Sequence, residues 1–224
     1  MKVVAIISQK GGAGKTTIAT ELAVAAHLAG YNTAIFDLDP QASAAVWGDD
    51  RKGAAPQVVA VQAPRLALYL ETARDQGCEV VLLDTAPHAD SIAVAAARVA
   101  DLVLIPCKPS PRDAVAVGTS LSTLSGLAAK PCHIIINEER RTVMGGVMAR
   151  ALEDYAALGA KLCPVRLGDR TAFVAALTRG QSSTEWEPDG RAASEVGRLW
   201  RWLAGELGLP GTRKAGNSKT REVA

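Results

Sequence analysis

The stretch SQKGGAGKTT, residues 8–17, has the composition and order of a loop that binds nucleotide phosphates. Its glycines allow a tight turn that brings successive backbone N–H groups against phosphate oxygens, at the mouth of a helix whose dipole favours anions. Lys15 is expected to reach the β- and γ-phosphates, and the hydroxyl of Thr16 is expected to coordinate Mg²⁺. The residues predicted to line the phosphates are Gly11, Gly12, Ala13, Gly14, Lys15, Thr16 and Thr17.

Two positions of this loop depart from the common form G-x-x-x-x-G-K-[ST]. That form has a glycine five positions before Gly14, whereas this chain has Gln9 there, followed by a second lysine, Lys10. Gly11 and Gly12 can make the turn that the missing glycine would make. Flexible turns before helices also collect glycine, but here the full GKTT segment lies between a predicted strand and a predicted helix. The sequence therefore predicts a variant phosphate loop.

Three aspartates follow predicted strands. Asp84 ends the apolar run VVLLD, where a carboxylate of a nucleotide site holds Mg²⁺, usually through water. An aspartate after a strand can instead cap a helix or form a turn. Asp37 and Asp39 are two residues apart in FDLDPQ, so in an extended segment they point the same way. That arrangement is costly unless a cation or a polar partner lies between them.

Six short apolar runs are predicted to be strands that are buried on both faces of a parallel sheet. They are residues 2–7, 33–39, 57–61, 79–84, 101–106 and 132–137. Helical stretches alternate with them, at residues 15–29, 64–76, 91–99, 112–128, 144–158 and 190–207. This alternation predicts an α/β fold with a doubly wound, mostly parallel sheet and helices on both faces. Ligands of such folds bind beyond the carboxyl ends of the strands, where the loop and the aspartates lie.

The composition is that of an ordinary globular protein. With 224 residues, 48% of them hydrophobic and 21% charged, the chain is long enough for one well-buried α/β domain. No apolar run approaches the roughly 20 residues that span a bilayer, and the N-terminus lacks a signal segment. We therefore expect a cytoplasmic protein with no membrane partner. Cys78, Cys107, Cys132 and Cys163 are far apart and are expected to be buried reduced thiols.

The charge is distributed unevenly along the chain. Residues 210–224 carry a net charge of +3, which leaves −1 for residues 1–209 out of the total of +2. The near-neutral body, predicted to be a single domain, argues against a globally basic nucleic-acid binder but leaves room for a local basic patch. The basic tail is rich in Gly, Pro and Ser and is predicted to be disordered.

The segments KGGAGKTT, DLDPQ and LLDTAP, in this order and setting, resemble the ParA/MinD group of deviant Walker ATPases. The more specific resemblance is to the small ParA-type (ParF-like) partition ATPases without an N-terminal helix-turn-helix domain, and it extends from residue 2 to about residue 207. In that group the glycine that Gln9 replaces is often absent, and an extra lysine, matched here by Lys10, is the defining feature. The resemblance implies a P-loop NTPase fold, ATP and Mg²⁺ as ligands, and slow hydrolysis of ATP to ADP and phosphate.

The resemblance also implies a role for each charged residue of the site. Lys10 would cross the interface of an ATP-sandwiched homodimer to the partner's phosphates, where its charge offsets the repulsion between two triphosphates. The alternative for Lys10 is a solvated loop lysine. Asp39 matches the acid that orients the attacking water, and Asp37 would support the metal and the loop. The predicted catalytic residues are Lys10, Lys15 and Asp39, and the predicted metal site comprises Thr16, Asp37 and Asp84.

The family resemblance places the adenine near two later segments. Asn137 in IIINEERR matches the asparagine that often contacts the base, and Pro164 in CPVR lies in the corresponding proline-containing loop. Glu138 stands where the family's familiar Asn-Arg pair has arginine, so the base contacts of this chain differ from the usual pattern. Asn137 could instead be a turn residue at the end of a strand.

ATP-bound dimers of this family bind DNA non-specifically through basic residues late in the chain, and such binding is salt-dependent. The residues predicted to contact DNA are Arg166, Arg170, Arg198 and Arg201, and further candidates are Arg140, Arg141, Arg179, Arg191 and the tail. Arg198 and Arg201 share one face of the last predicted helix. For any single arginine, the alternative is a solvated helix face.

Three functional classes compete within this family. The first is a DNA-segregating ATPase whose hydrolysis is stimulated by a ParB-like, centromere-bound partner, which makes the protein nucleoid-associated. The second is an ATPase that positions another cargo, such as a carboxysome or a chemotaxis cluster, along the nucleoid. The third is a MinD-like regulator of cell division, which is disfavoured because the tail has a single late aliphatic residue, Val223. The surroundings of the cysteines, which follow Pro or Gly or lie beside strands, also disfavour an iron–sulfur relative.

Overall fold

The structure is a computed structural model that describes residues 1–124, 130–139 and 160–212. The predicted helix at residues 144–158, Arg140 and Arg141 lie outside the described residues, as do the end of the helix predicted at residues 112–128 and most of the basic tail.

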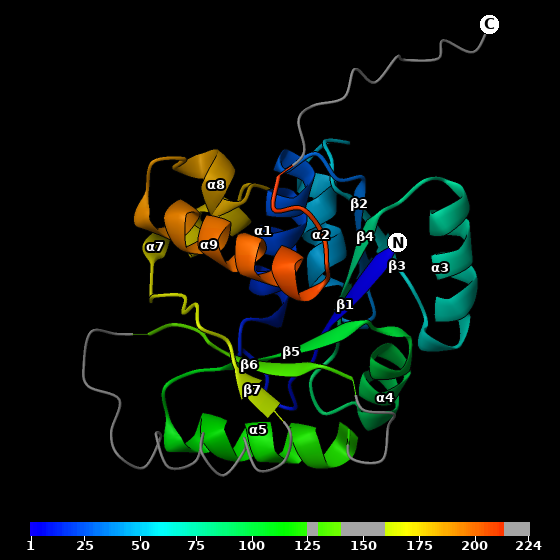
Figure 1. Cartoon of the computed structure of the whole chain (residues 1–224), viewed down its shortest axis with the longest axis vertical. Helices are drawn as coiled ribbons and strands as arrows, with labels where there is room; N and C mark the ends of the chain where they lie inside the picture. Colours follow the sequence, from blue (N-terminus) through cyan, green and yellow to red (C-terminus); the bar gives the residue numbers. More distant parts are fainter. Residues whose placement is uncertain (125–129, 140–159, 213–224) are drawn as a thin grey trace, which may run out of the picture.

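A seven-stranded sheet forms the centre of the described part of the chain, and every neighbouring pair of its strands is parallel (Figure 1). The order across the sheet is β3-β2-β4-β1-β5-β6-β7. The strands are β1 (Lys2–Ile6), β2 (Thr33–Asp37), β3 (Gln57–Ala60), β4 (Val80–Asp84), β5 (Leu102–Cys107), β6 (Cys132–Ile136) and β7 (Ala160–Leu162). The predicted fold class is confirmed, with β7 as an additional strand that is only three residues long.

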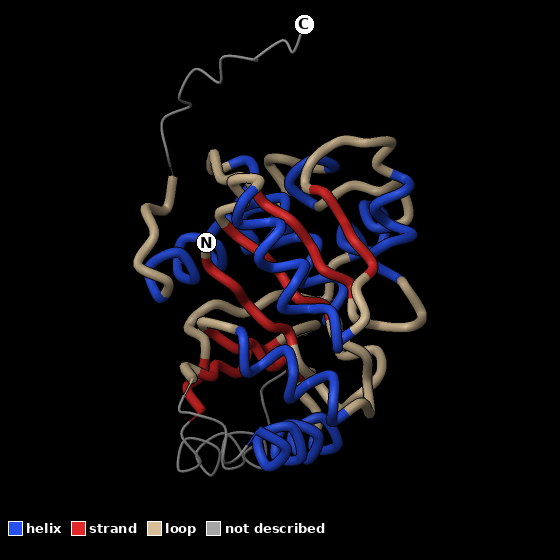
Figure 2. Tube along the Cα trace, turned by 90° about the vertical axis from the view of Figure 1, so that its right-hand side faces the viewer, coloured by secondary structure: helices blue, strands red, loops and turns tan. Residues whose placement is uncertain are grey.

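Helices cover both faces of this sheet (Figures 1 and 2). One face packs against α1 (Lys15–Leu28), α2 (Ser43–Asp50), α7 (Thr171–Leu177) and α9 (Arg191–Glu206), with α8 (Ser183–Trp186) packed against α1 and α9. The other face packs against α3 (Leu66–Asp75), α4 (Asp90–Val99) and α5 (Pro111–Leu124), and a short 3-10 helix, η1 (Ala63–Arg65), precedes α3.

The alternation of side chains along each strand explains this two-sided core. In β1, Val4 and Ile6 point to one apolar cluster, while Val3 and Ala5 point to the other. Every residue of β4 is buried, as expected for a central strand that is covered on both faces. This arrangement places the carboxyl ends of β1, β2 and β4 at one edge of the sheet.

The last helix shows the predicted amphipathic face. Val196, Leu199 and Leu203 of α9 are fully buried, and Trp200 beside them is 3% exposed. The indole of Trp200 packs edge-to-face on Tyr31 and donates a hydrogen bond of 2.9 Å to the carbonyl oxygen of Gly211. The Tyr31 hydroxyl donates a hydrogen bond of 2.6 Å to the carbonyl oxygen of Pro210. The first residues of the predicted tail therefore lie against the body.

All four cysteines are free thiols, as predicted. Cys78, Cys107 and Cys163 are buried, and Cys132 is half-buried. Burial raises the pKa of the Cys107, Cys132 and Cys163 thiols to about 12. These thiols therefore stay protonated near neutral pH.

Within residues 1–124, 130–139 and 160–212, no helix is both long enough and apolar enough to cross a bilayer.

Candidate nucleotide site

The loop between β1 and α1 has the backbone shape that its glycines predict. Gly12 has φ +70° and Gly14 has φ +96°, values in the left-handed region that favours glycine. A Cβ atom on Gly14 would lie 2.1 Å from Nδ2 of Asn137, which is impossible without movement. A Cβ on Gly11 would meet no atom within 4 Å. The loop is therefore tightly packed at Gly14 and open on the side of Gly11.

Asn137 braces this loop from the end of β6. Its side-chain amide donates a hydrogen bond of 2.9 Å to the carbonyl oxygen of Ala13, and the residue is buried. Asn137 was predicted to contact adenine. The structure places its amide nitrogen on the phosphate loop itself.

Lys15 lies folded into the loop. It is 7% exposed, and its ammonium donates to the carbonyl oxygens of Ser8 and Lys10 at 3.3 Å each. Burial lowers the pKa of Lys15, and the nearby carboxylates of Asp84 and Asp39 oppose that effect. The cation is therefore held at the loop by long hydrogen bonds that a phosphate can replace.

Thr16 and Asp84 form a direct contact at the point where α1 begins and β4 ends. The hydroxyl of Thr16 donates a hydrogen bond of 2.6 Å to Oδ2 of Asp84. Asp84 is completely buried, and its Oδ1 has no hydrogen-bond partner among the described residues. Burial raises the pKa of Asp84 to about 7, against the lowering effect of the Thr16 hydrogen bond. A hydroxyl beside a carboxylate oxygen without a partner is a donor set that suits Mg²⁺.

Asp37 and Asp39 lie at the carboxyl end of β2. The strand ends at Asp37, two residues earlier than predicted, so Asp39 lies in the turn that follows it. Asp37 is buried, and its two oxygens accept hydrogen bonds from the backbone N–H groups of Asp39 at 3.0 Å and Ala45 at 2.9 Å. Burial raises the pKa of Asp37, and these hydrogen bonds oppose that effect. Asp37 thus shapes the turn that leads into α2.

Asp39 is half-buried beside the phosphate loop. Its Oδ1 accepts a hydrogen bond of 2.9 Å from the N–H of Gln41, and its charge acts on the pKa of Lys15. The structure therefore brings Lys15, Thr16, Asp39 and Asp84 to the same edge of the sheet.

Lys10 forms an ion pair with Asp113 on α5. Its Nζ lies 2.7 Å from Oδ2 of Asp113, and the side chains are 38% and 4% exposed. Ser110 donates a hydrogen bond to the same carboxylate oxygen. Sequence reasoning missed Asp113. A single acid in the first turn of a helix usually interacts with the helix dipole. No sequence signal therefore links Asp113 to a lysine that lies 103 positions earlier.

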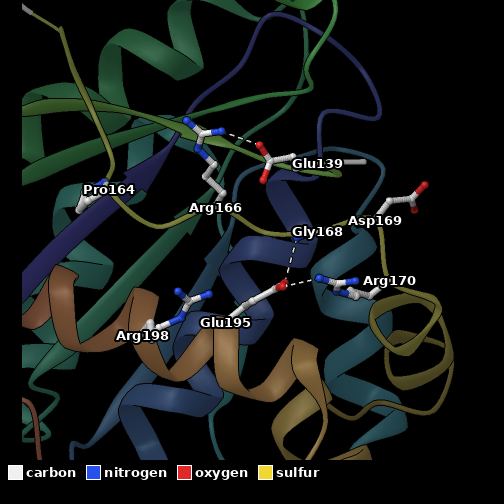
Figure 3. Close-up of a pocket in the computed structure, with 8 residues that line it drawn as sticks. All are labelled: Glu139, Pro164, Arg166, Gly168, Asp169, Arg170, Glu195 and Arg198. Carbon is white, nitrogen blue, oxygen red and sulfur yellow. Dashed lines mark hydrogen bonds and ion pairs between the residues drawn. The ribbon is translucent and has the colours of Figure 1, made fainter. Parts of the chain in front are cut away.

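A polar cavity of about 510 Å³ brings together several residues that were predicted separately (Figure 3). Arg166 pairs with Glu139 at 2.6 Å, and Arg170 pairs with Glu195 at 2.7 Å. Glu195 also accepts a hydrogen bond of 2.9 Å from the N–H of Gly168. The lining residues are Glu139, Pro164, Arg166, Gly168, Asp169, Arg170, Glu195 and Arg198.

The four predicted DNA-contacting arginines therefore differ in their surroundings. Arg166 and Arg170 are neutralised by carboxylates, whereas Arg198 is exposed at the cavity with no ion pair among the described residues. Arg201 is exposed on α9, outside the cavity. A smaller pocket shares Gly168, Asp169 and Arg170 with this cavity and reaches Thr17 in the first turn of α1 and Asn137 after β6. The arginine-lined cavity thus adjoins the phosphate loop.

A model of the CobQ/CobB/MinD/ParA nucleotide binding domain matches residues 4–183. The chain belongs to this family. Among curated members, it is 33% identical over 211 residues to the Maintenance of carboxysome distribution protein A of Gloeobacter kilaueensis, over 89% of this chain and 96% of that protein. It is 28% identical over 192 residues to Protein ParA of Rhizobium radiobacter, over 80% of this chain and 84% of that protein.

Solved structures of MinD and ParA relatives share the fold of this CobQ/CobB/MinD/ParA domain. McdA from Cyanothece in complex with ATP superimposes with a TM-score of 0.67 at 16% identity, over 96% of this chain and 99% of that chain. MinD in the MinC:MinD complex from Aquifex aeolicus gives a TM-score of 0.70 at 17% identity, over 88% and 93%. The open side of the loop and the Thr16–Asp84 pair fit a nucleotide with its metal.

Proposed function

We propose that this chain is a ParA-type ATPase that hydrolyses ATP slowly to ADP and phosphate, and that its nucleotide state controls self-association and DNA binding. The observation that carries the proposal is the joint placement of Lys15, the Thr16–Asp84 pair and Lys10 around one glycine loop. Membership of the nucleotide-binding family and the ATP complex of McdA support it.

Each residue of the loop has a task in this proposal. Lys15 exchanges its bonds to the backbone carbonyls for bonds to the β- and γ-phosphates, while the loop N–H groups hold the remaining oxygens. Thr16 and Asp84 would hold Mg²⁺, which neutralises charge on the phosphates when it is bound. Asp39 orients the attacking water, and Asp37 fixes the turn that carries Asp39.

Lys10 makes hydrolysis depend on a second copy of the chain. Its ion pair with Asp113 keeps the ammonium at the rim of the site in a single chain. In an ATP-bound homodimer, Lys10 leaves Asp113 and reaches the partner's phosphates, since two facing triphosphates repel one another without added positive charge. The site would therefore be complete only across the dimer interface.

We propose that the ATP dimer is cytoplasmic and binds non-specific DNA, so that it associates with the nucleoid. The exposed Arg198 and Arg201 are the first candidates for phosphate contacts, and Arg166 and Arg170 can join them only if their ion pairs open. A ParB-like or cargo-adaptor partner would stimulate hydrolysis and release the DNA. The name of the Rhizobium ParA relative supports a partition role.

A second candidate is the positioning of another cargo along the nucleoid. The specific observation in its favour is the 33% identity to a carboxysome distribution protein over almost its whole length. Both candidates use the same ATPase cycle, and a separate adaptor protein specifies the cargo. The gene beside this one and a pull-down from the native host distinguish them, because partition requires a centromere-binding partner.

The ATPase proposal is tested by phosphate release and light scattering. The wild-type chain with ATP and Mg²⁺ should release phosphate slowly. Asp39→Ala should give a stable dimer with ATP and a loss of turnover of at least tenfold, because ATP is bound without an oriented water. Lys10→Ala should bind ATP yet remain monomeric. The sandwich proposal fails if Asp39→Ala stays monomeric in saturating ATP.

A further inference from the structure

Gln9 occupies the position of the missing glycine, and its side chain makes contacts that no glycine could make. It is 8% exposed, and its Nε2 donates hydrogen bonds to Oδ1 of Asp90 and, at 3.5 Å, to the hydroxyl of Thr123. The Thr123 hydroxyl also donates to Asp90 Oδ1 at 3.3 Å. These three side chains close a small ring of hydrogen bonds, which we call the Gln9 clamp.

The Gln9 clamp joins three elements of the site. Gln9 lies in the phosphate loop, Asp90 is the first residue of α4, and Thr123 lies near the end of the described part of α5. The connection that leads into α4 begins directly after Asp84, the predicted metal ligand. The clamp therefore ties the start of the loop to the segment that follows the metal carboxylate.

Helix α5 holds two consecutive loop residues at once. Its first turn pairs with Lys10 through Asp113, and two turns later Ser120 accepts a hydrogen bond of 3.2 Å from the backbone N–H of Gln9. Asp113 and Ser120 are seven residues apart, so they lie on one face of the helix. Helices α4 and α5 pack against each other, and α5 also packs against the interior strand β5 (Figure 1). The position of Lys10 is thus set by its neighbour as well as by its own ion pair.

We infer that Gln9 is a positioning residue of the variant loop, which holds Lys10 in register with α4 and α5 so that it can be presented to a second copy of the chain. This inference rests on the proposed ATP-dependent dimerisation. It accounts for the glycine-to-glutamine difference: glycine leaves the start of a loop free, whereas glutamine fixes it to two helices. The clamp acts on the presentation of Lys10 and leaves nucleotide contacts within one chain unchanged.

An exchange of hydrogen-bonding groups tests the clamp. Gln9→Glu places a second carboxylate against Asp90 and breaks the contact. Asp90→Asn keeps it, because the new side-chain oxygen still accepts from Gln9. The double variant Gln9→Glu/Asp90→Asn restores the bond with donor and acceptor reversed, at the net charge of the wild type. The readouts are the protein concentration at half-maximal ATP-dependent dimerisation, the affinity for ADP and the melting temperature.

We expect Gln9→Glu to raise the half-maximal concentration by about tenfold, Asp90→Asn to change it by less than about twofold, and the double variant to recover most of the loss. ADP affinity should stay within about twofold in all three. A double variant that is no better than Gln9→Glu overturns the inference, as does a Gln9→Glu variant that dimerises like the wild type. If Gln9→Glu does not fold, Asp90→Ala is measured instead. We expect Asp90→Ala to raise the half-maximal concentration by about threefold, and the absence of any increase would contradict the clamp. A wild type that neither dimerises nor hydrolyses ATP contradicts the proposed function instead.

Discussion

Gly14 is the glycine of the loop that has the least room for a side chain. It combines φ +96° with the amide of Asn137 at 2.1 Å from where a Cβ would lie. Gly11 shows the opposite case, since its Cβ would meet nothing within 4 Å. The two glycines therefore provide a matched pair within one loop.

We expect Gly14→Ala to lower the free energy of unfolding of the nucleotide-free protein by about 2–4 kcal/mol, because it adds both backbone strain and a clash. Gly11→Ala should change it by less than about 1 kcal/mol. Urea denaturation without nucleotide measures both. Equal effects of the two substitutions would show that the loop is not packed as described.

In the proposed ATP dimer, Asp113 would compete with the partner's phosphates for Lys10. Because the Lys10 side chain is 38% exposed, removal of the Asp113 charge should have a modest effect on dimerisation. We expect Asp113→Asn to lower the protein concentration at half-maximal ATP-dependent dimerisation by about threefold, as measured by light scattering. The control is Asp75→Asn, which removes an exposed charge on α3. A midpoint that is unchanged or raised contradicts this competition.

At the residue scale, the spacing of residues along the chain predicted the members of the phosphate loop and of the metal site. Lys15, Thr16 and Asp84 lie together as their motif requires. The partners Asp113 and Asn137 could not be placed in this way. Their contacts with the loop are made across more than 100 residues, and a lone aspartate or asparagine carries no signal for such a contact.

At the scale of elements, α8 is joined to α1 through a buried carboxylate. Glu21 accepts hydrogen bonds from the backbone N–H and the hydroxyl of Ser183, at 2.8 and 2.7 Å. Burial raises the pKa of Glu21 from 4.5 to about 7, and the charge of Glu185 adds to this effect. Between pH 4.5 and about pH 7, Glu21 keeps its proton in the folded chain and releases it in the unfolded chain. Glu21 therefore makes stability fall as the pH rises through this window.

We expect the free energy of unfolding of the wild type, relative to Glu21→Gln, to fall by up to roughly 3 kcal/mol between pH 4.5 and pH 7.5. The difference between the two curves isolates Glu21 from the other buried acids. Chemical denaturation across this range measures it, with the exposed Glu71→Gln on α3 as control. Parallel curves for wild type and Glu21→Gln would contradict the assigned pKa.

Short elements held by distant contacts are the ones that the sequence did not predict. The end of α2 is fixed by Arg51, which pairs with Glu185 at 2.8 Å, donates to the carbonyl oxygen of Gly180 and lies over the ring of Trp47. The strands β1–β6 and the long helices α1, α3, α4, α5 and α9 were predicted because their apolar periodicity is local. α2, α7 and α8 depend on partners that are remote in the sequence.

At the scale of the whole molecule, ion pairing distinguishes the arginines that are proposed to contact DNA. Arg198 and Arg201 are exposed on one helix, while Arg166 and Arg170 are paired with carboxylates. The unpaired arginines are better placed to contact DNA phosphates, because each paired arginine must first break its ion pair.

We expect Arg198→Glu/Arg201→Glu to weaken co-sedimentation with DNA in ATP and Mg²⁺ by at least tenfold and to reduce its dependence on salt. Arg65→Glu/Arg74→Glu, at η1 and α3 on the opposite face of the sheet, has the same charge change and should bind DNA almost like the wild type. If both double variants bind DNA equally well, α9 is not the contact.

The surroundings of the four thiols have a practical consequence for fluorescence labelling. Burial raises the pKa of the Cys107, Cys132 and Cys163 thiols, so maleimide dyes, which react with accessible thiolates, should label these positions slowly. Cys78 is buried as well, and its pKa is also raised. A cysteine introduced at Val115, 69% exposed on α5, can therefore carry a fluorophore while the native core stays intact.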